Sequence, residues 1–214
     1  MNVYVVGIGG VGGMFSLALT RLLTRKDSIC LFDPDKYEGK NYGRQLAVMP
    51  GKPKTAGLGQ VIASAFPVCS VIGIVAKIQE AIDCEFVTNF RPDVLICCAD
   101  NQEARRYCFT EAKRRGLKFL SAANEAEQSE ACYWEPGLPE PSEYLDWTTE
   151  PPPRTGHCED EPEQTLAANI LAGGLLIDLF TKWIIRPPDV KLKRYTPYFT
   201  RLSGRFLEKK CLED

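Results

Sequence analysis

The stretch at residues 1–35 constrains the fold more than any other part of this sequence. A short apolar run at residues 3–6 is followed at once by the segment GIGGVGG, which begins at Gly7. Apolar residues then recur at helical spacing, and a second apolar run ends on Asp33. This order predicts a strand, a tight glycine turn, a helix and a second strand.

A glycine turn in this setting is typical of a nucleotide site. Glycines let the backbone approach a phosphate, and the first turn of the helix offers free N–H groups at the positive end of its dipole. We therefore predict that the turn contacts a nucleotide and that Asp33 accepts hydrogen bonds from ribose hydroxyls. The alternative is that the glycines only permit close packing. The glycines concerned are Gly7, Gly9, Gly10 and Gly12.

Composition and charge argue against several classes of protein. The chain is 44% hydrophobic and 25% charged, as globular proteins are, and its net charge of −2 gives no basic field for nucleic acid. The longest apolar stretch, residues 166–185, contains Asn169, Asp178 and Lys182, so we predict a buried helix and no membrane span. Because the first strand begins near residue 3, we expect no signal peptide.

The nine cysteines include no CxxC pair. Several of them, such as Cys97 and Cys98, lie in predicted core strands. We therefore expect reduced, mostly buried thiols in a cytoplasmic protein, and no zinc site.

Predicted strands alternate with predicted helices over the first 120 residues. This alternation predicts an α/β fold of the Rossmann-like, doubly wound kind, with a mainly parallel sheet and helices on both faces. Ligands of such sheets bind beyond the carboxyl ends of the strands. The predicted strands are 3–6, 29–32, 71–75, 93–98 and 118–122, and the predicted helices after the first are 55–66, 80–89 and 102–115.

The second part of the chain has a different character. After a predicted strand at 131–134, residues 135–163 are rich in proline and acidic residues and form an irregular excursion. A C-terminal helix at 164–185 and a basic tail to residue 214 follow, with short strands predicted at 190–195 and 198–202. We predict a single domain over residues 1–214, with a nucleotide-binding core at 1–125.

The loop after Asp33 carries side chains that can hold anions, namely Asn41, Arg44, Gln45 and Lys54. A dinucleotide on a glycine turn needs little extra positive charge, whereas a triphosphate that reacts at its α-phosphorus does. Arginine supplies a planar fork for phosphate oxygens and lysine supplies a point charge. The alternative is that these side chains are solvated loop charges.

Asp100 follows the fourth predicted strand, at the same edge of the sheet as Asp33. Hard cations take carboxylate oxygens, so we predict that Asp100 is a Mg²⁺ ligand. The pair Asp100–Asn101 is also suited to cap the next helix.

Five short motifs in this order resemble the ThiF/MoeB/HesA family of adenylating enzymes, which are related to the ubiquitin-activating enzymes. They cover about residues 3–125 and read GIGGVGG, FDPD, NYGRQ, GKPK and CADN. The later His157-Cys158 and the sequence QTLAAN at 164–169 also resemble ThiF-type proteins found beside plasmid PRTRC gene clusters.

The resemblance implies an ATP-dependent adenylyltransferase. In this family the C-terminal carboxylate of a ubiquitin-like or sulfur-carrier protein attacks the α-phosphorus of ATP, giving an acyl adenylate and pyrophosphate. The reaction depends on charge neutralisation and positioning more than on acid–base chemistry. The resemblance also implies ATP and Mg²⁺ at the site and a homodimer.

By motif position, the resemblance assigns a role to each candidate residue. The glycines surround the nucleotide, and Asp33 and Asp35 belong to its binding set, with Asp33 on the ribose. The phosphates fall to Asn41, Arg44, Gln45 and Lys54. Arg44, Lys54 and Asp100 are the implied catalytic residues, and Asp100 is the implied Mg²⁺ ligand.

The sequence departs from the family pattern in three places. Many relatives carry an arginine on a helix before the first strand, and that arginine reaches the partner subunit's ATP. This sequence begins at the strand, so Arg21 and Arg25 are the candidates for that role. The family's paired CxxC zinc motif is missing, and the substrate-holding part is small, so residues 135–163 are expected to recognise the partner's tail.

Some relatives pass the activated carboxylate to a cysteine, and Cys158 is the candidate here. It lies in the irregular excursion beside His157, and a protonated neighbour lowers the pKa of a thiol. The acidic residues at 159–161 oppose that effect, so a structural thiol is the alternative.

Three other functions remain open at this stage. A nicotinamide-dependent oxidoreductase would use the same glycine turn and Asp33, but would not need Arg44 and Lys54. A related enzyme would adenylate a small carboxylate or a tRNA-borne group. A binding module would keep the fold and lose turnover.

Overall fold

A computed structural model describes residues 1–46, 49–65, 69–124, 128–145, 165–204 and 206–212. Its centre is an eight-stranded sheet with the order β3-β2-β1-β4-β5-β6-β7-β8, parallel from β3 to β5 and antiparallel from there to β8. The strands are β1 (Asn2–Val6), β2 (Ser28–Phe32), β3 (Ser70–Ile74), β4 (Val94–Cys97), β5 (Lys118–Asn124), β6 (Gln128–Trp134), β7 (Phe199–Ser203) and β8 (Phe206–Lys210).

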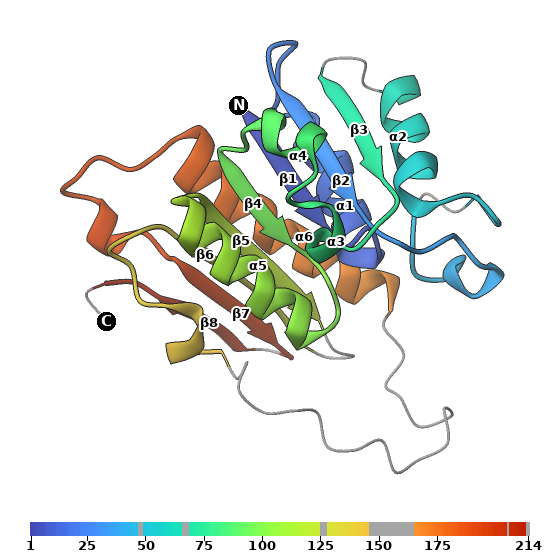
Figure 1. The fold of residues 1–214 in the computed structure, drawn as a ribbon. Coiled ribbons are helices and arrows are strands. Elements are labelled where there is room, and N and C mark those ends of the chain that lie inside the picture. The colour runs from blue at the N-terminus through green and yellow to red at the C-terminus, as the bar shows by residue number, and fades with distance from the viewer. Residues whose placement is uncertain (47–48, 66–68, 125–127, 146–164, 205, 213–214) are drawn as a thin grey trace.

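Helices cover both faces of this sheet. They are α1 (Gly10–Leu19), α2 (Lys54–Ala65), α3 (Ile78–Ala81), α4 (Glu85–Phe90), α5 (Gln102–Arg115) and α6 (Leu166–Phe180). In Figure 1, α4 and α5 lie in front of the sheet, and α1 and α6 lie behind it. Helix α6 packs against α1, β5 and β6, so the last helix of the chain reaches the glycine-rich first helix.

The strands at the centre of the sheet form where the sequence is apolar without alternation. β4 is buried throughout, and β1 and β2 are buried except for their first residues. Side chains on both faces of such strands must be apolar, which is the signature of a parallel sheet covered by helices. This confirms the predicted α/β fold with a mainly parallel sheet and helices on both faces.

The order of the strands fixes where a ligand can bind. β1 lies between β2 and β4, so the connections from this point run to opposite sides of the sheet. A crevice opens beyond the carboxyl ends of the strands at such a switch point. β1 leads into Gly7 and β4 leads into Cys98, which brings two of the sequence motifs to one edge.

Three predicted elements need correction. Residues 80–89 form two short helices instead of one, because the chain turns at Ile82 and α4 starts afresh after an extended Cys84. Residues 190–195 are not a strand: the carbonyl of Asp189 accepts from the N–H groups of Leu192 and Lys193, and a 3₁₀ turn follows at Lys193–Tyr195. β8 was not predicted, because its sequence FLEKK is mostly charged.

The C-terminal helix has the packing of a core helix. Helix α6 continues as a π-helical turn at Thr181–Ile185, and together they are long and apolar enough to cross a membrane by length and composition. Leu176, Leu179 and Trp183 of this segment are at most 1% exposed. Trp183 stacks on Tyr133 of β6, at 4.7 Å between ring centroids, which fixes the helix on the sheet.

Candidate functional site

The glycine turn between β1 and α1 is shaped mainly by what packs around it. Gly7 has φ +83°, a conformation that side chains disfavour, and a Cβ there would lie 2.7 Å from the backbone nitrogen of Ala99. A Cβ on Gly12 would lie 1.9 Å from the Gly7 carbonyl oxygen, and one on Gly10 would overlap Asn169. Gly9 differs, because its Cβ would point into open space. Close packing therefore accounts for Gly7, Gly10 and Gly12, whereas it does not account for Gly9, where contact with a nucleotide stays a prediction.

Asp33 lies directly beside this turn. Its Oδ2 accepts from the Ile8 N–H at 2.6 Å and its Oδ1 accepts from the Asp35 N–H at 2.9 Å. Burial raises the pKa of Asp33, because desolvation outweighs the attraction of the nearby Lys54 ammonium. The carboxylate thus braces the turn, and each of its oxygens retains a second lone pair that could accept from a ribose hydroxyl.

Lys54 reaches the same place from the first residue of α2. Its Nζ lies 2.8 Å from Asp35 Oδ2 and 3.9 Å from Asp33 Oδ1. Only 12% of the lysine side chain is exposed. The predicted phosphate-binding lysine is therefore a largely buried cation at the carboxyl end of β2, and it is not a solvated loop charge.

Asn41 organises the loop that carries Arg44. Its Oδ1 accepts from the Glu38 N–H at 2.7 Å, and its carbonyl accepts from the N–H groups of Arg44 and Gln45. Asn41 is 4% exposed, so the structure gives its side chain a loop-stabilising role. Whether it also touches a phosphate stays a prediction.

Arg44 and Gln45 hold buried polar atoms that the fold does not satisfy. Among the described residues, Arg44 Nε and Gln45 Oε1 have no hydrogen-bond partner. The Arg44 carbonyl accepts from Asn169 Nδ2 at 2.8 Å. Because buried polar groups are normally paired, the two orphaned atoms indicate a place where a polar ligand would be received.

Asp100 and Asn101 divide the two roles that the sequence left open. Asn101 caps α5, with its Oδ1 accepting from the Ala104 N–H at 2.8 Å. Asp100 is exposed and takes no part in that cap. Asp100 directly follows Ala99, the residue on which Gly7 packs, and its carboxylate oxygens are of the kind that a hard cation such as Mg²⁺ takes.

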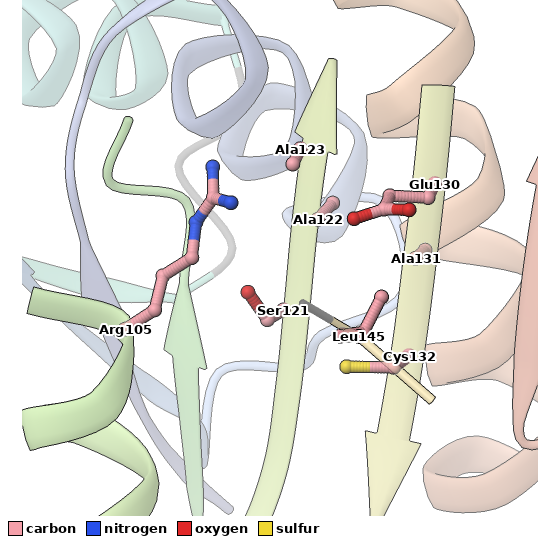
Figure 2. Close-up of a pocket in the computed structure, with 8 residues that line it drawn as sticks. All are labelled: Arg105, Ser121, Ala122, Ala123, Glu130, Ala131, Cys132 and Leu145. Atoms are coloured by element: carbon pink, nitrogen blue, oxygen red, sulfur yellow. The ribbon is translucent and has the colours of Figure 1, made fainter. Parts of the chain in front are cut away.

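Sequence reasoning missed Arg105. Its Nε donates to the carbonyl of Ala99 at 2.9 Å, which steadies the residue before Asp100. Figure 2 shows Arg105 of α5 beside β5, with Ser121 pointing toward it. They line a cavity of about 10 Å³, which is enough for roughly one water molecule. The sequence did carry a signal for this residue, because Arg105 lies four residues after the cap residue Asn101, about one turn along α5.

Two of the predicted roles are not tested by the described residues. Cys158 and His157 lie outside the described residues, so the thioester hypothesis stays a prediction. Arg21 and Arg25 follow the C-terminal end of α1, whereas the glycine turn lies at its N-terminal end. A ten-residue helix is about 15 Å long. Within one chain, these two arginines therefore lie at the far end of α1 from the glycine turn, and their predicted role at the partner subunit's nucleotide stays a prediction.

Five of the described cysteines are buried, whereas Cys84 is exposed and Cys69 and Cys211 are partly buried. Cys97 belongs to β4 and Cys98 follows it, and both are buried, as predicted. Burial raises the pKa of the Cys132 thiol to about 12. A thiol in that state is a poor nucleophile at neutral pH.

Solved structures of E. coli MccB share this fold. The structure of MccB with ATP has a TM-score of 0.69 at 17% identity, and it aligns over 99% of this chain and 63% of the MccB chain. MccB alone has a TM-score of 0.74 at 16% identity, over 99% and 62%. PaaA has a TM-score of 0.70 at 15% identity, over 99% and 64%. The chain thus spans less than two thirds of the length of these proteins.

No curated protein sequence matches the chain. The model of the ThiF family matches residues 1–212, nearly the whole chain. The motifs at the carboxyl edge of the sheet, the fold around them and this match agree, and the chain belongs to the ThiF family.

Proposed function

We propose that the protein is an ATP-dependent adenylyltransferase that activates a carboxylate at the end of a protein or peptide chain. The observation that carries the proposal is the meeting of four motifs at one edge of the sheet. The glycine turn packs on the residue before Asp100, Asp33 binds the turn, and Lys54 lies beside Asp33.

The free polar groups at this edge fit a triphosphate. Gly9 leaves open space in front of the first turn of α1, whose N–H groups have no side-chain cap. Arg44 brings a buried Nε that has no hydrogen-bond partner in the part of the chain that the structure describes, and Lys54 brings a largely buried ammonium. A nicotinamide dinucleotide would use the turn and Asp33 but would leave both cations without a role.

In the proposed reaction, an oxygen of the substrate carboxylate attacks the α-phosphorus of ATP. A new bond forms between that oxygen and phosphorus, the bond to the β-phosphate bridging oxygen breaks, and pyrophosphate leaves with its electron pair. Negative charge develops on the phosphate oxygens, and the fixed cations Arg44 and Lys54 stabilise it. No proton has to move, which agrees with a site built from cations and backbone N–H groups.

Mg²⁺ bound by Asp100 would supply further neutralisation of the triphosphate charge. Other residues of this chain hold the backbone on either side of Asp100 in place. Arg105 fixes the Ala99 carbonyl and Asn101 caps α5, and the exposed Asp100 takes part in neither interaction.

The finer part of the proposal concerns the partner. MccB has been solved together with MccA, and with MccA and the ATP analogue AMPCPP. We infer by likeness that the carboxylate comes from a chain terminus, such as that of a ubiquitin-like or sulfur-carrier protein. Homodimerisation and transfer of the acyl group to Cys158 belong to the same proposal.

Nucleotide-induced thermal stabilisation tests the proposal. A ligand that binds only the folded state raises the unfolding midpoint by mass action. We expect ATP with Mg²⁺ to stabilise the native protein and to stabilise Arg44→Ala and Asp100→Ala much less. Ile170→Ala, an exposed change on α6, serves as the matched control that keeps the full shift.

The same experiment with NAD⁺ and NADP⁺ separates the rival function. Stabilisation by NAD⁺ but not by ATP, unaffected by the Arg44 and Asp100 substitutions, would replace the adenylyltransferase proposal with an oxidoreductase.

A further inference from the structure

Asn169 connects the last helix of the chain to the Arg44 loop. Its side chain is 0% exposed, and its Nδ2 donates to the Arg44 carbonyl at 2.8 Å across 125 residues of sequence. Helix α6 is otherwise apolar around this position, with Ala168 and Ala172 buried next to it. A buried amide in such a helix needs a reason beyond packing.

The same amide touches the glycine-rich helix. A Cβ on Gly10 would lie 2.1 Å from Asn169 Nδ2 and 2.4 Å from its Oδ1. The amide therefore fills the space above the first residue of α1, where a side chain on residue 10 would otherwise lie. One side chain thus contacts both the start of α1 and the backbone of Arg44.

The arrangement is not optimal for stability alone. Asn169 Oδ1 is buried and has no hydrogen-bond partner among the described residues, and the same holds for Arg44 Nε and Gln45 Oε1. Leaving a buried amide oxygen unpaired costs free energy, whereas leucine has a similar volume and would bury no polar atom. The three unpaired atoms belong to residues joined by hydrogen bonds to one another or to Asn41, so they form one polar cluster beside the glycine turn.

We propose that Asn169 is a positioning residue: it holds the Arg44 backbone against the start of α1, so that the guanidinium meets the β- and γ-phosphates of a nucleotide bound at the glycine turn. This inference rests on the proposed function. It assigns Asn169 an effect on triphosphate binding that operates through Arg44, and no contact between Asn169 and the nucleotide is required.

The test is a double-mutant cycle on nucleotide affinity. Dissociation constants for ATP–Mg²⁺ and for AMP are measured by calorimetry for the native protein, Arg44→Ala, Asn169→Leu and the double variant. We expect each single change to weaken ATP binding by at least about tenfold and to leave AMP binding within about twofold, the size of effect expected for one charge-assisted hydrogen bond. We expect the double variant to bind ATP no more weakly than Arg44→Ala alone.

The AMP measurement and the cycle separate positioning from a general structural role. Ile170→Ala, the exposed neighbour on α6, is the matched control and keeps both affinities. If Asn169→Leu does not fold, Asn169→Ser is the second variant, because it removes the amide without adding volume. If both variants fail to fold, the role of Asn169 is structural and the proposal is wrong.

The remaining outcomes decide between the two proposals. Suppose that Arg44→Ala weakens ATP binding. The positioning role is then wrong, and the proposed function stands, if Asn169→Leu has no effect on ATP affinity or weakens AMP binding equally. The same conclusion follows if the fold-loss in ATP affinity of the double variant is the product of the two single fold-losses. If Arg44→Ala leaves ATP affinity unchanged, the proposed function fails and this inference fails with it.

Discussion

At the scale of single residues, Gly7 carries two constraints at once. Its φ of +83° and the 2.7 Å approach to Ala99 both exclude a side chain. We predict that Gly7→Ala lowers the free energy of unfolding by about 2–4 kcal/mol, the sum of backbone strain and a backbone clash. Denaturant unfolding measures this change.

Gly13 provides the matched control for that prediction. It lies inside α1, and a Cβ there would meet nothing within 4 Å. Gly13→Ala should stabilise the protein by about 0.5–1 kcal/mol, because alanine loses less entropy in a helix. Equal losses in both variants would mean that the turn geometry described here is wrong.

Asp100 and Asn101 give a second residue-scale prediction. Asn101→Ala removes a helix cap and should cost about 1 kcal/mol of stability, while the additional stabilisation that Mg²⁺ gives to the ATP complex remains. Asp100→Asn should change stability by less than about 0.5 kcal/mol and abolish that additional stabilisation. Thermal unfolding with ATP, with and without Mg²⁺, checks both; loss of the Mg²⁺ effect in Asn101→Ala alone would reverse the assignment.

The sequence allowed the candidate binding residues to be predicted better than the residues that hold them in place. Asp33, Lys54 and Asp100 could be proposed from the sequence, because each follows or begins a recognisable element. Asn169 and Arg105 could not, because their partners are backbone carbonyls, of Arg44 and Ala99, that only the folded chain brings near. The second role of Asp33, accepting a hydrogen bond from the Ile8 N–H, could not be predicted from the sequence either.

At the scale of elements, α5 is stabilised by charge at its C-terminal end. Glu111 pairs with Arg114 and Arg115, and these hydrogen bonds, Arg114 first, hold the pKa of Glu111 below its ordinary value of 4.5. A carboxyl group with a lowered folded-state pKa stabilises the fold above its unfolded value. That stability is lost as the pH falls through the folded-state pKa.

We therefore predict that Glu111→Gln lowers stability by about 1 kcal/mol at pH 7, since the arginine partners are partly exposed. The difference from the native protein should shrink as the pH falls below 4.5. Unfolding curves from pH 3 to 7 measure this difference. A difference that is constant with pH would contradict the ion-pair explanation.

Element prediction succeeded where a single pattern dominated and failed where patterns conflicted. α5 has its expected bounds because Asn101 and Gly116 mark both ends. Residues 190–195 alternate as a strand would, but the turn at Asp189 sets their geometry. β8 follows a hairpin turn at Gly204, and its pairing with β7 outweighs a charged sequence.

At the scale of the whole molecule, the position of the last helix matters most. The mainly parallel sheet with helices on both faces follows from the alternation of strands and helices in the first 120 residues. The packing of α6 on α1 does not, because Leu19 at the end of α1 and Leu166 at the start of α6 are already 147 residues apart, and no local pattern encodes such a contact. It is this packing that brings Asn169 to the Arg44 loop.

The proposed function requires that this edge of the sheet binds a triphosphate. The most direct measurement is the affinity of the native protein and Lys54→Ala for ATP–Mg²⁺, AMP and NAD⁺ by calorimetry. We predict that the native protein binds ATP at least about tenfold more tightly than AMP, and that Lys54→Ala removes most of this difference. Equal affinity for ATP and AMP, or tighter binding of NAD⁺ that is unchanged in Lys54→Ala, would contradict the account.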